Sequence, residues 1–190
     1  VSDGKGGLQP RYTMNLSVTE ATNARELAEY MAGAFNAVFY DDGNGVARLK
    51  VDKDEDAVAL FTKEDVVDGE FIYSFTDIQS QKNRLIVSFE NPDLDWNEDR
   101  RAVEDLDHIA LYGEQPDNFI AVGCIDVQEA LRRGRHKMHT DITETCSVVF
   151  RTNRIAHHVN PFETILISDD DLGYSLSGVV TSIASLTEFS

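Results

Sequence analysis

Three aspartates are spaced like the ligands of a calcium-binding loop. Asp52, Asp54 and Asp56 alternate along the chain, and carboxylate oxygens at this spacing could surround one Ca²⁺ ion. However, Ala57 stands where the loop requires a glycine turn, and Lys63 stands where its bidentate glutamate should be. We therefore interpret the three aspartates as a solvated acidic turn.

Two further clusters combine residues that can bind metal ions. His136 and His139 are three residues apart on an expected helix, so both rings could reach one ion. Four cationic neighbours disfavour a metal there, namely Arg132, Arg133, Arg135 and Lys137. Asp169, Asp170 and Asp171 precede Leu172-Gly173, a pattern typical of a turn between strands. We interpret the first cluster as a basic helix face and the second as a turn.

The sequence shows no arrangement that is typical of nucleophilic catalysis or phosphate binding. It has no G-x-S-x-G elbow, and neither Cys124 nor Cys146 is flanked by histidine or by a glycine-rich oxyanion loop. His157-His158 has no third ligand nearby, and Gly4-Lys5-Gly6-Gly7 lacks the Walker spacing and a preceding strand. Because the chain has 34 acidic residues, many pairs of carboxylates could be named, so no single pair indicates glycoside hydrolysis. We therefore predict no catalytic, cofactor-binding or metal-ligating residue and no cofactor.

The chain that would position these residues is acidic but able to fold. It carries 34 acidic and 17 basic side chains, which gives a formal net charge of −17, and 42% of its residues are apolar. The charge argues against binding to nucleic-acid phosphates or to anionic membranes. A compact monomer of this mass would expose about 9,000 Å². The two cysteines lack a C-x-x-C partner, which favours reduced thiols in the cytoplasm and leaves a disulfide between them open.

Apolar periodicity predicts short strands and two main helices. The expected strands cover residues 12–18, 37–40, 46–51, 71–75, 85–89, 119–122, 146–150, 165–167 and 179–183. The expected main helices cover residues 24–35 and 127–138, with Asn23 and Asp126 as N-caps, and Gly134 would allow close approach of a neighbouring element. Shorter helical turns are expected at residues 62–67 and 107–112.

This pattern predicts an α+β fold, in which short antiparallel strands form β-barrel-like sheets with two main helices. Residues 90–117 carry ten acidic residues against two arginines, and we expect them to form a loop or a boundary. The expected organisation is a flexible lead at residues 1–10, an α+β domain at residues 11–90, and a second β-rich domain with one helix at residues 91–190. We expect the chain to be a fragment of a longer protein.

Short non-catalytic phrases follow one another along the sequence in a distinctive order. They are Arg11-Tyr12-Thr13-Met14-Asn15, Gly33-Ala34-Phe35, Phe39-Tyr40 with Arg48-Leu49, Asp52-Lys53 with Asp56-Ala57-Val58, residues 61–73, Asn91-Pro92 before Trp96, Val103-Glu104-Asp105, Ile109-Ala110-x-Tyr112-Gly113, Phe119 with Gly123-Cys124, and Asp169-Asp170-Asp171 before a glycine. In this order they closely resemble the central part of the tip attachment (host specificity) proteins of lambda-like tailed phages. The resemblance runs roughly over residues 10–185, and its strongest single phrase is residues 62–73.

The resemblance implies a structural virion protein and carries over no catalytic residue. It implies a part of the trimeric central hub of a tail tip, which caps or continues the tail tube. The implied partners are further copies of the chain, which form a trimer in the assembled tail although the isolated fragment can be a monomer, other tail-tip and tail-tube proteins, and DNA that passes nearby without specific binding, with no membrane. The host receptor would be contacted by regions outside this fragment. The implied location is the tail tip of the virion, with the host cytoplasm as the place of assembly.

Two other functions remain as alternatives. Some tail-tip hubs carry a cell-wall hydrolase domain, although this sequence shows neither a zinc-binding set nor a nucleophile arrangement. A receptor- or glycan-binding module is the other alternative, and it is weakened by a single tryptophan, Trp96, and by the lack of an aromatic-rich loop.

The acidity acquires a specific meaning if the chain belongs to a hub. A basic wall around a DNA channel would hold the phosphates by counterion release, whereas an acidic wall would not. Eighteen of the 34 acidic residues lie in residues 52–70 and 90–117. We hypothesise that the acids of residues 90–117 face the channel or a groove between subunits.

Overall fold

The computed structural model describes residues 1, 6–18, 23–41, 45–53, 55–152, 158–171 and 174–183. The chain divides into two compact units, each assembled from two separate stretches. Unit 1 comprises Val1–Asn23 and Ser74–Ser147, and unit 2 comprises Ala24–Tyr73 and Val148–Ser190. The chain therefore passes from one unit to the other three times.

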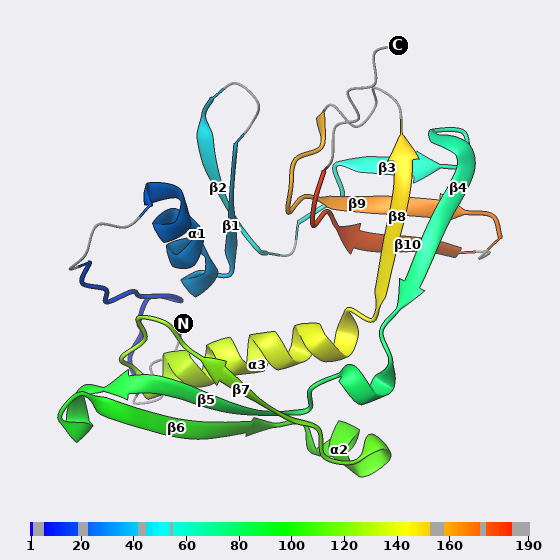
Figure 1. The fold of residues 1–190 in the computed structure, drawn as a ribbon. Coiled ribbons are helices and arrows are strands. Elements are labelled where there is room, and N and C mark those ends of the chain that lie inside the picture. The colour runs from blue at the N-terminus through cyan, green and yellow to red at the C-terminus, as the bar shows by residue number, and fades with distance from the viewer. Residues whose placement is uncertain are drawn as a thin grey trace. The chain divides into compact units, whose positions relative to one another are not determined.

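Unit 1 is built on a three-stranded sheet in the order β6-β5-β7 (Figure 1). Strand β5 (Arg84–Asn91) pairs antiparallel with β6 (Asn97–Glu104) and parallel with β7 (Pro116–Ile120). The short helix α2 (Leu106–Tyr112) connects β6 to β7, and the longer helix α3 (Val127–Thr143) packs against β5 and β6. Two 3-10 turns, Ile78–Ser80 and Pro92–Leu94, flank β5.

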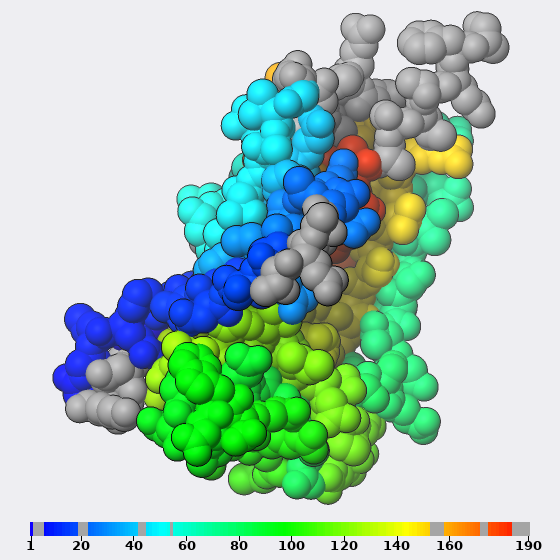
Figure 2. Space-filling model, turned by 60° about the vertical axis from the view of Figure 1, so that its left-hand side comes forward, coloured from blue at the N-terminus to red at the C-terminus, as the bar shows by residue number. Residues whose placement is uncertain are grey.

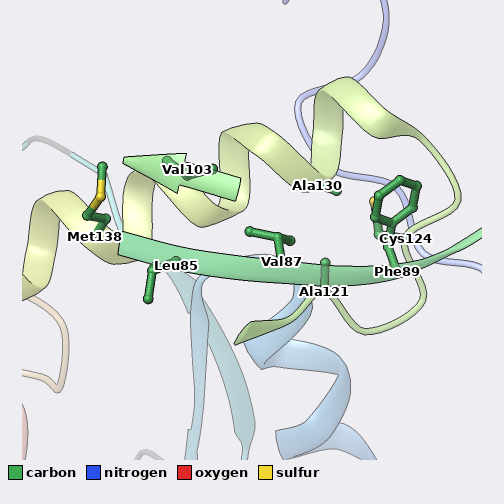
Figure 3. Packing of buried hydrophobic residues seen from close by; sticks show 8 residues of the cluster. All are labelled: Leu85, Val87, Phe89, Val103, Ala121, Cys124, Ala130 and Met138. Atoms are coloured by element: carbon green, nitrogen blue, oxygen red, sulfur yellow. The ribbon is translucent and has the colours of Figure 1, made fainter. Parts of the chain in front are cut away.

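The core of unit 1 lies between α3 and one face of this sheet (Figure 3). Alternate residues of β5, namely Leu85, Val87 and Phe89, are buried because the period of two directs them all to the face that α3 covers. Gly134 of α3 lies so close to β5 that a Cβ atom there would stand 2.5 Å from Cγ2 of Val87. This confirms that Gly134 permits a close approach. The remaining members of the core are Val103, Ala121, Cys124, Ala130 and Met138.

Unit 2 contains the helix α1 and most of the strands. Its elements are α1 (Ala24–Ala34), β1 (Ala37–Asp41), β2 (Ala47–Val51), β3 (Ala59–Thr62), β4 (Val66–Phe75), β8 (Cys146–Thr152), β9 (Thr164–Asp169) and β10 (Tyr174–Val179), with the ends of β4 and β8 extending into unit 1. They form the hairpin β1-β2, the pair β4-β8 and the sheet β10-β9-β3. In the last of these, β9 pairs antiparallel with β10 and parallel with β3.

A separate core holds unit 2 together. Its buried members are Phe61, Val159, Ile165 and Ile167. Phe150 of β8 packs on this cluster, with its ring centroid 5.2 Å from that of Phe61 and 5.3 Å from that of Phe71. Offset and edge-on aromatic pairs at such distances contribute beyond their buried area. Strands that are distant in sequence are thus joined by aromatic side chains.

The predicted α+β class is confirmed, whereas the β-barrel-like arrangement of antiparallel strands is wrong. The described strands form small open sheets that do not close into a barrel, and two of their pairings are parallel. Parallel pairing requires a long connection, and more than a hundred residues separate β3 from β9. Periodicity within one strand carries no information about such a distant partner. The two main helices are confirmed, and so is the shorter helix expected at residues 107–112, which is α2.

Four local predictions are wrong. Residues 12–18 form no strand, residues 62–67 contain the end of β3, a turn at residues 63–65 and the start of β4 rather than a helix, and the last strand among the described residues is Tyr174–Val179 rather than residues 179–183. The largest error concerns residues 90–117, which contain β6 and the start of β7 in place of a loop, besides the expected short helix. Most of their acidic residues are exposed, and so are the apolar Leu106 and Leu111, whereas Val103 is buried in the core. The acidic composition therefore concealed the strands.

The expected boundary near residue 90 does not coincide with the two units, because that position lies within β5. None of the helices in the described ranges is long and apolar enough to cross a membrane.

Candidate functional site

A group of buried polar contacts in unit 1 surrounds the N-terminal turn of α3. Asp126 caps this helix by accepting a hydrogen bond of 2.8 Å from the Glu129 backbone N–H. Glu129 and Arg133 follow one turn apart, and they are only 2% and 3% exposed. We call these two side chains the clamp.

The clamp holds an extended segment from the N-terminal part of the chain, residues 8–18, which we call the arm. The Thr13 backbone N–H donates to Glu129 Oε1 over 2.9 Å, and the Thr13 hydroxyl donates to Glu129 Oε2. Arg133 donates to the carbonyl oxygens of Thr13 and Val122, each over 2.7 Å. Arg133 also donates to Glu129, so the two charges neutralise each other inside the unit.

A second set of contacts fixes the arm beside the loop that follows β7. The Asn15 backbone N–H donates to the Gly123 carbonyl over 2.9 Å. Gly123 has a positive φ of 63°, and a Cβ atom there would stand 2.9 Å from Cγ of Met14. Both observations explain why glycine occupies this position. The arm, dark blue in Figures 1 and 2, thus lies against the residues just before α3.

Unit 2 has a polar pocket of about 520 Å³ at the ends of β4 and β9. Asp169, which is 5% exposed, accepts a 2.8 Å hydrogen bond from the Tyr73 hydroxyl and lies 3.3 Å from Nζ of Lys63. Lys63 also forms a 2.7 Å ion pair with the exposed Asp171. Phe71 and Glu70 also line this pocket.

The electrostatics of this pocket favour the charged forms. Burial opposes the ionisation of Asp169, but hydrogen bonds from Tyr73, from the Asp171 backbone N–H and from Lys63 outweigh it and lower the pKa of the carboxyl. The hydrogen bond to Asp171 raises the pKa of the Lys63 ammonium, against the effect of desolvation. Lys63, Asp169 and Asp171 therefore stabilise one another's charged forms.

The described residues among our candidate metal ligands form no metal-binding group. Asp52 donates its backbone N–H to the Asn36 carbonyl, while Asp54, His157 and the Gly4-Lys5 pair lie outside the described residues. His139 is exposed on α3 and His136 contacts Thr140. Within the described ranges, no three His, Cys, Asp or Glu side chains are grouped so that they could hold a metal ion. The prediction that the chain binds no metal stays a prediction.

The aspartates at the end of β9 do form a turn, as expected, and Asp169 additionally enters the pocket. Cys124 is buried and Cys146 is exposed, and both are free thiols. Burial raises the pKa of the Cys124 thiol. This agrees with the preference for reduced cysteines.

Sequence reasoning missed the clamp and the pocket. The Glu129–Arg133 spacing of four residues, next to the small residues Ala130 and Gly134, was a visible signal for a buried helical ion pair. No local signal connects that pair with Thr13, because 116 residues separate Thr13 from Glu129.

Comparison with known proteins places the chain among phage tail proteins. A family model described as "Putative phage tail protein" matches residues 23–183. The "Tip attachment protein J" of Escherichia phage SECphi27 is 28% identical over 193 residues, which cover 100% of this chain and 16% of that protein. The protein of the same name from Escherichia phage SECphi4 is 24% identical over 135 residues, 70% of this chain and 12% of that one.

Solved structures show the same fold at much lower identity. The tail protein from Neisseria meningitidis MC58 superposes with a TM-score of 0.60 at 9% identity, covering 85% of this chain and 50% of that one. The 43 kDa tail protein of prophage MuSo2 from Shewanella oneidensis gives 0.55 at 13% identity, covering 86% and 48%. The chain thus spans about half of these structures and a small part of the tip attachment proteins.

Proposed function

Because the chain belongs to this family of phage tail proteins, we propose that it forms part of the central hub of a tail tip. A structural role in the tail follows from the family itself. In the hub, the chain would cap or continue the tail tube as a homotrimer and would contact other tail-tip and tail-tube proteins. The host receptor would be contacted by regions outside the present chain.

One observation carries this proposal: the family match extends over residues 23–183 and therefore includes parts of both units. The relatives named tip attachment protein match the chain over a short part of their length. That relation fits a module of a longer hub protein. The location that follows is the virion, with assembly in the host cytoplasm.

Symmetry tests the hub proposal. Tails that contain the full-length protein should show threefold density at the position of this module in cryo-electron microscopy. A sixfold ring at that position, or a protein that is absent from purified tails, would contradict the proposal.

We also propose that the acidic surface of residues 90–117 faces the DNA channel or a groove between subunits. Eight of the ten acidic residues in this range are exposed, namely Glu90, Asp93, Asp95, Glu98, Glu104, Asp107, Glu114 and Asp117. Such a wall would let DNA pass without adhesion, because no clustered cations are offered to its phosphates.

A structural role without catalysis completes the proposal. The buried charged groups of the clamp bind each other and the backbone of the arm, and Asp169 of the pocket binds Tyr73 and Lys63, which suits packing rather than chemistry. A cell-wall hydrolase would instead clear a peptidoglycan suspension. Loss of turbidity on adding the purified chain, compared with a heat-denatured sample, would revive that alternative.

A further inference from the structure

We propose that the clamp is a strand acceptor through which one copy of this chain holds the arm of a second copy. This inference rests on the homotrimer proposed above. Residues 8–18 of one copy would occupy the site formed by Glu129, Arg133 and Gly123 of the next. The contacts would be those seen within one chain, made between chains.

The mode of recognition supports such an exchange. The acceptor binds the backbone of the arm at alternate residues, through both the N–H and the carbonyl of Thr13 and through the N–H of Asn15. Recognition of alternate backbone groups is how an extended segment is added to an acceptor surface. The Thr13 hydroxyl and the Met14 side chain add specificity for this sequence. Any identical copy presents the same groups.

The connectivity of the chain also supports it. The arm belongs to unit 1, but the chain continues from it into unit 2 and returns to unit 1 only at Ser74. The arm is therefore a separate piece of unit 1 in sequence. Exchange of an identical element between protomers costs little free energy, because the same contacts are formed between chains as within one chain.

The distal part of the arm carries apolar side chains at alternate positions. Leu16 and Val18 stand on either side of the polar Ser17. Leu16 and Val18 are 42% and 52% exposed. In an exchanged assembly these apolar side chains would lie beside the neighbouring copy.

Arm exchange has a direct consequence for symmetry. The donor surface and the acceptor surface are different parts of the chain, so the contact is heterologous. Heterologous contacts form a ring when the rotation closes. Three copies that each donate one arm and accept one arm would close a trimer without a second interface.

Engineered disulfides can distinguish exchange from binding within one chain. A Cβ at position 123 would stand 2.9 Å from Cγ of Met14, near the separation of about 3 Å between a Cβ and the opposite sulfur of a disulfide. Met14→Cys and Gly123→Cys would be introduced singly, in the full 190-residue chain carrying Cys124→Ser and Cys146→Ser. The Met14→Cys copy carries a larger tag, and the two are refolded together and oxidised.

Exchange predicts a covalent heterodimer of the two single variants and, for the double variant, cross-linked species up to a trimer. A double variant that gives only an internally bridged monomer, with no heterodimer in the mixture, overturns the proposal. Met14→Cys mixed with Asp95→Cys, on the exposed turn before β6, is the matched control and should give no heterodimer.

A second measurement avoids any change at Gly123. Mixed samples of isotope-labelled and unlabelled natural chain should show intermolecular contacts between the Met14 methyl group and the Gly123 backbone in filtered NMR spectra. The native mass is determined in the same samples. A trimer without these contacts overturns arm exchange and leaves the hub proposal standing. A monomer without them also overturns arm exchange, whereas the trimer of the full-length protein is tested separately by the symmetry of assembled tails.

Discussion

The clamp shows how strongly the surroundings of a charged pair decide its contribution. Glu129 and Arg133 form an i,i+4 pair on α3 that is almost fully buried. Arg25 and Glu29 form an i,i+4 pair of the same residue types on α1, with side chains 65% and 49% exposed. The chain therefore contains its own comparison between a buried and an exposed ion pair.

We predict that Glu129→Ala destabilises unit 1 by about 3–5 kcal/mol, because Arg133 is left as an uncompensated buried charge. Glu29→Ala, the matched control, should change the free energy of unfolding by less than about 0.5 kcal/mol. Urea denaturation of both variants measures the difference. Equal effects of the two substitutions would mean that the clamp is not closed in solution.

Asp169 should make the stability of unit 2 depend on pH. Its pKa is lowered from the ordinary value of 3.8 in the folded chain, so its contribution is present above that value and is lost as the pH falls through the lowered pKa. Asp169→Asn should therefore be less stable than the natural chain at neutral pH, and the two should converge as the pH falls through the lowered pKa of Asp169. Asp170→Asn, at the exposed neighbouring position, should follow the natural chain throughout. Thermal unfolding recorded at several pH values tests this.

At the scale of the elements, two helical glycines have opposite roles. Gly134 of α3 faces β5, where a Cβ atom would stand 2.5 Å from Cγ2 of Val87 and 3.2 Å from Cγ2 of Val103. Gly33 of α1 has no atom within 4 Å of the position that a Cβ would take. The same substitution therefore probes packing at one site and helix propensity at the other.

Gly134→Ala should destabilise unit 1 by about 3 kcal/mol, because α3 must move away from the sheet to admit the methyl group. Gly33→Ala should stabilise α1 by about 0.5–1 kcal/mol, because alanine is the better helix former. Denaturation midpoints of the two variants should shift in opposite directions. A shift in the same direction would show that α3 does not pack on β5 as described.

The elements differ in how well the sequence predicts them. Both main helices and the β1-β2 hairpin follow from local signals: the apolar stripe, the Asp126 cap and the turn residues between the two strands. Strand β6 has no comparable signal, because Glu98, Asp99 and Arg100 have low strand propensity. It forms because β5 lies alongside it, where Leu85 pairs with Val103 and the ion pair of Arg84 with Glu104 closes one end.

The candidate site could be predicted only in part, for the same reason. The Glu129–Arg133 spacing is local, whereas its partner Thr13 is determined by the path of the whole chain. The pocket likewise joins Tyr73 to Asp169 across 96 residues. Contacts of this range depend on tertiary structure and leave no periodic pattern in the sequence.

At the scale of the whole molecule, the proposed channel surface can be tested by its charge. Reversing Asp93, Asp95, Asp107 and Asp117 to lysine in assembled virions should slow DNA ejection, because lysines on a channel wall would bind the phosphates. Reversing Asp56, Glu64, Glu70 and Asp170 changes the net charge equally and should leave the rate unchanged. A fluorescent DNA-binding dye measures release from triggered particles. If the first set ejects DNA at the natural rate, these acids only solvate the surface.

The interleaved path of the chain has a consequence for its synthesis. All of unit 1 has left the ribosome once Ser147 has emerged, but unit 2 still lacks β9 and β10 at that moment. The strand β3 is translated early, whereas its parallel partner β9 is translated only after the second stretch of unit 1, Ser74–Ser147. During this interval its backbone is open to wrong partners, including those on neighbouring nascent chains. Codon usage or chaperone binding in the stretch before β9 would therefore affect the yield of unit 2 more than that of unit 1.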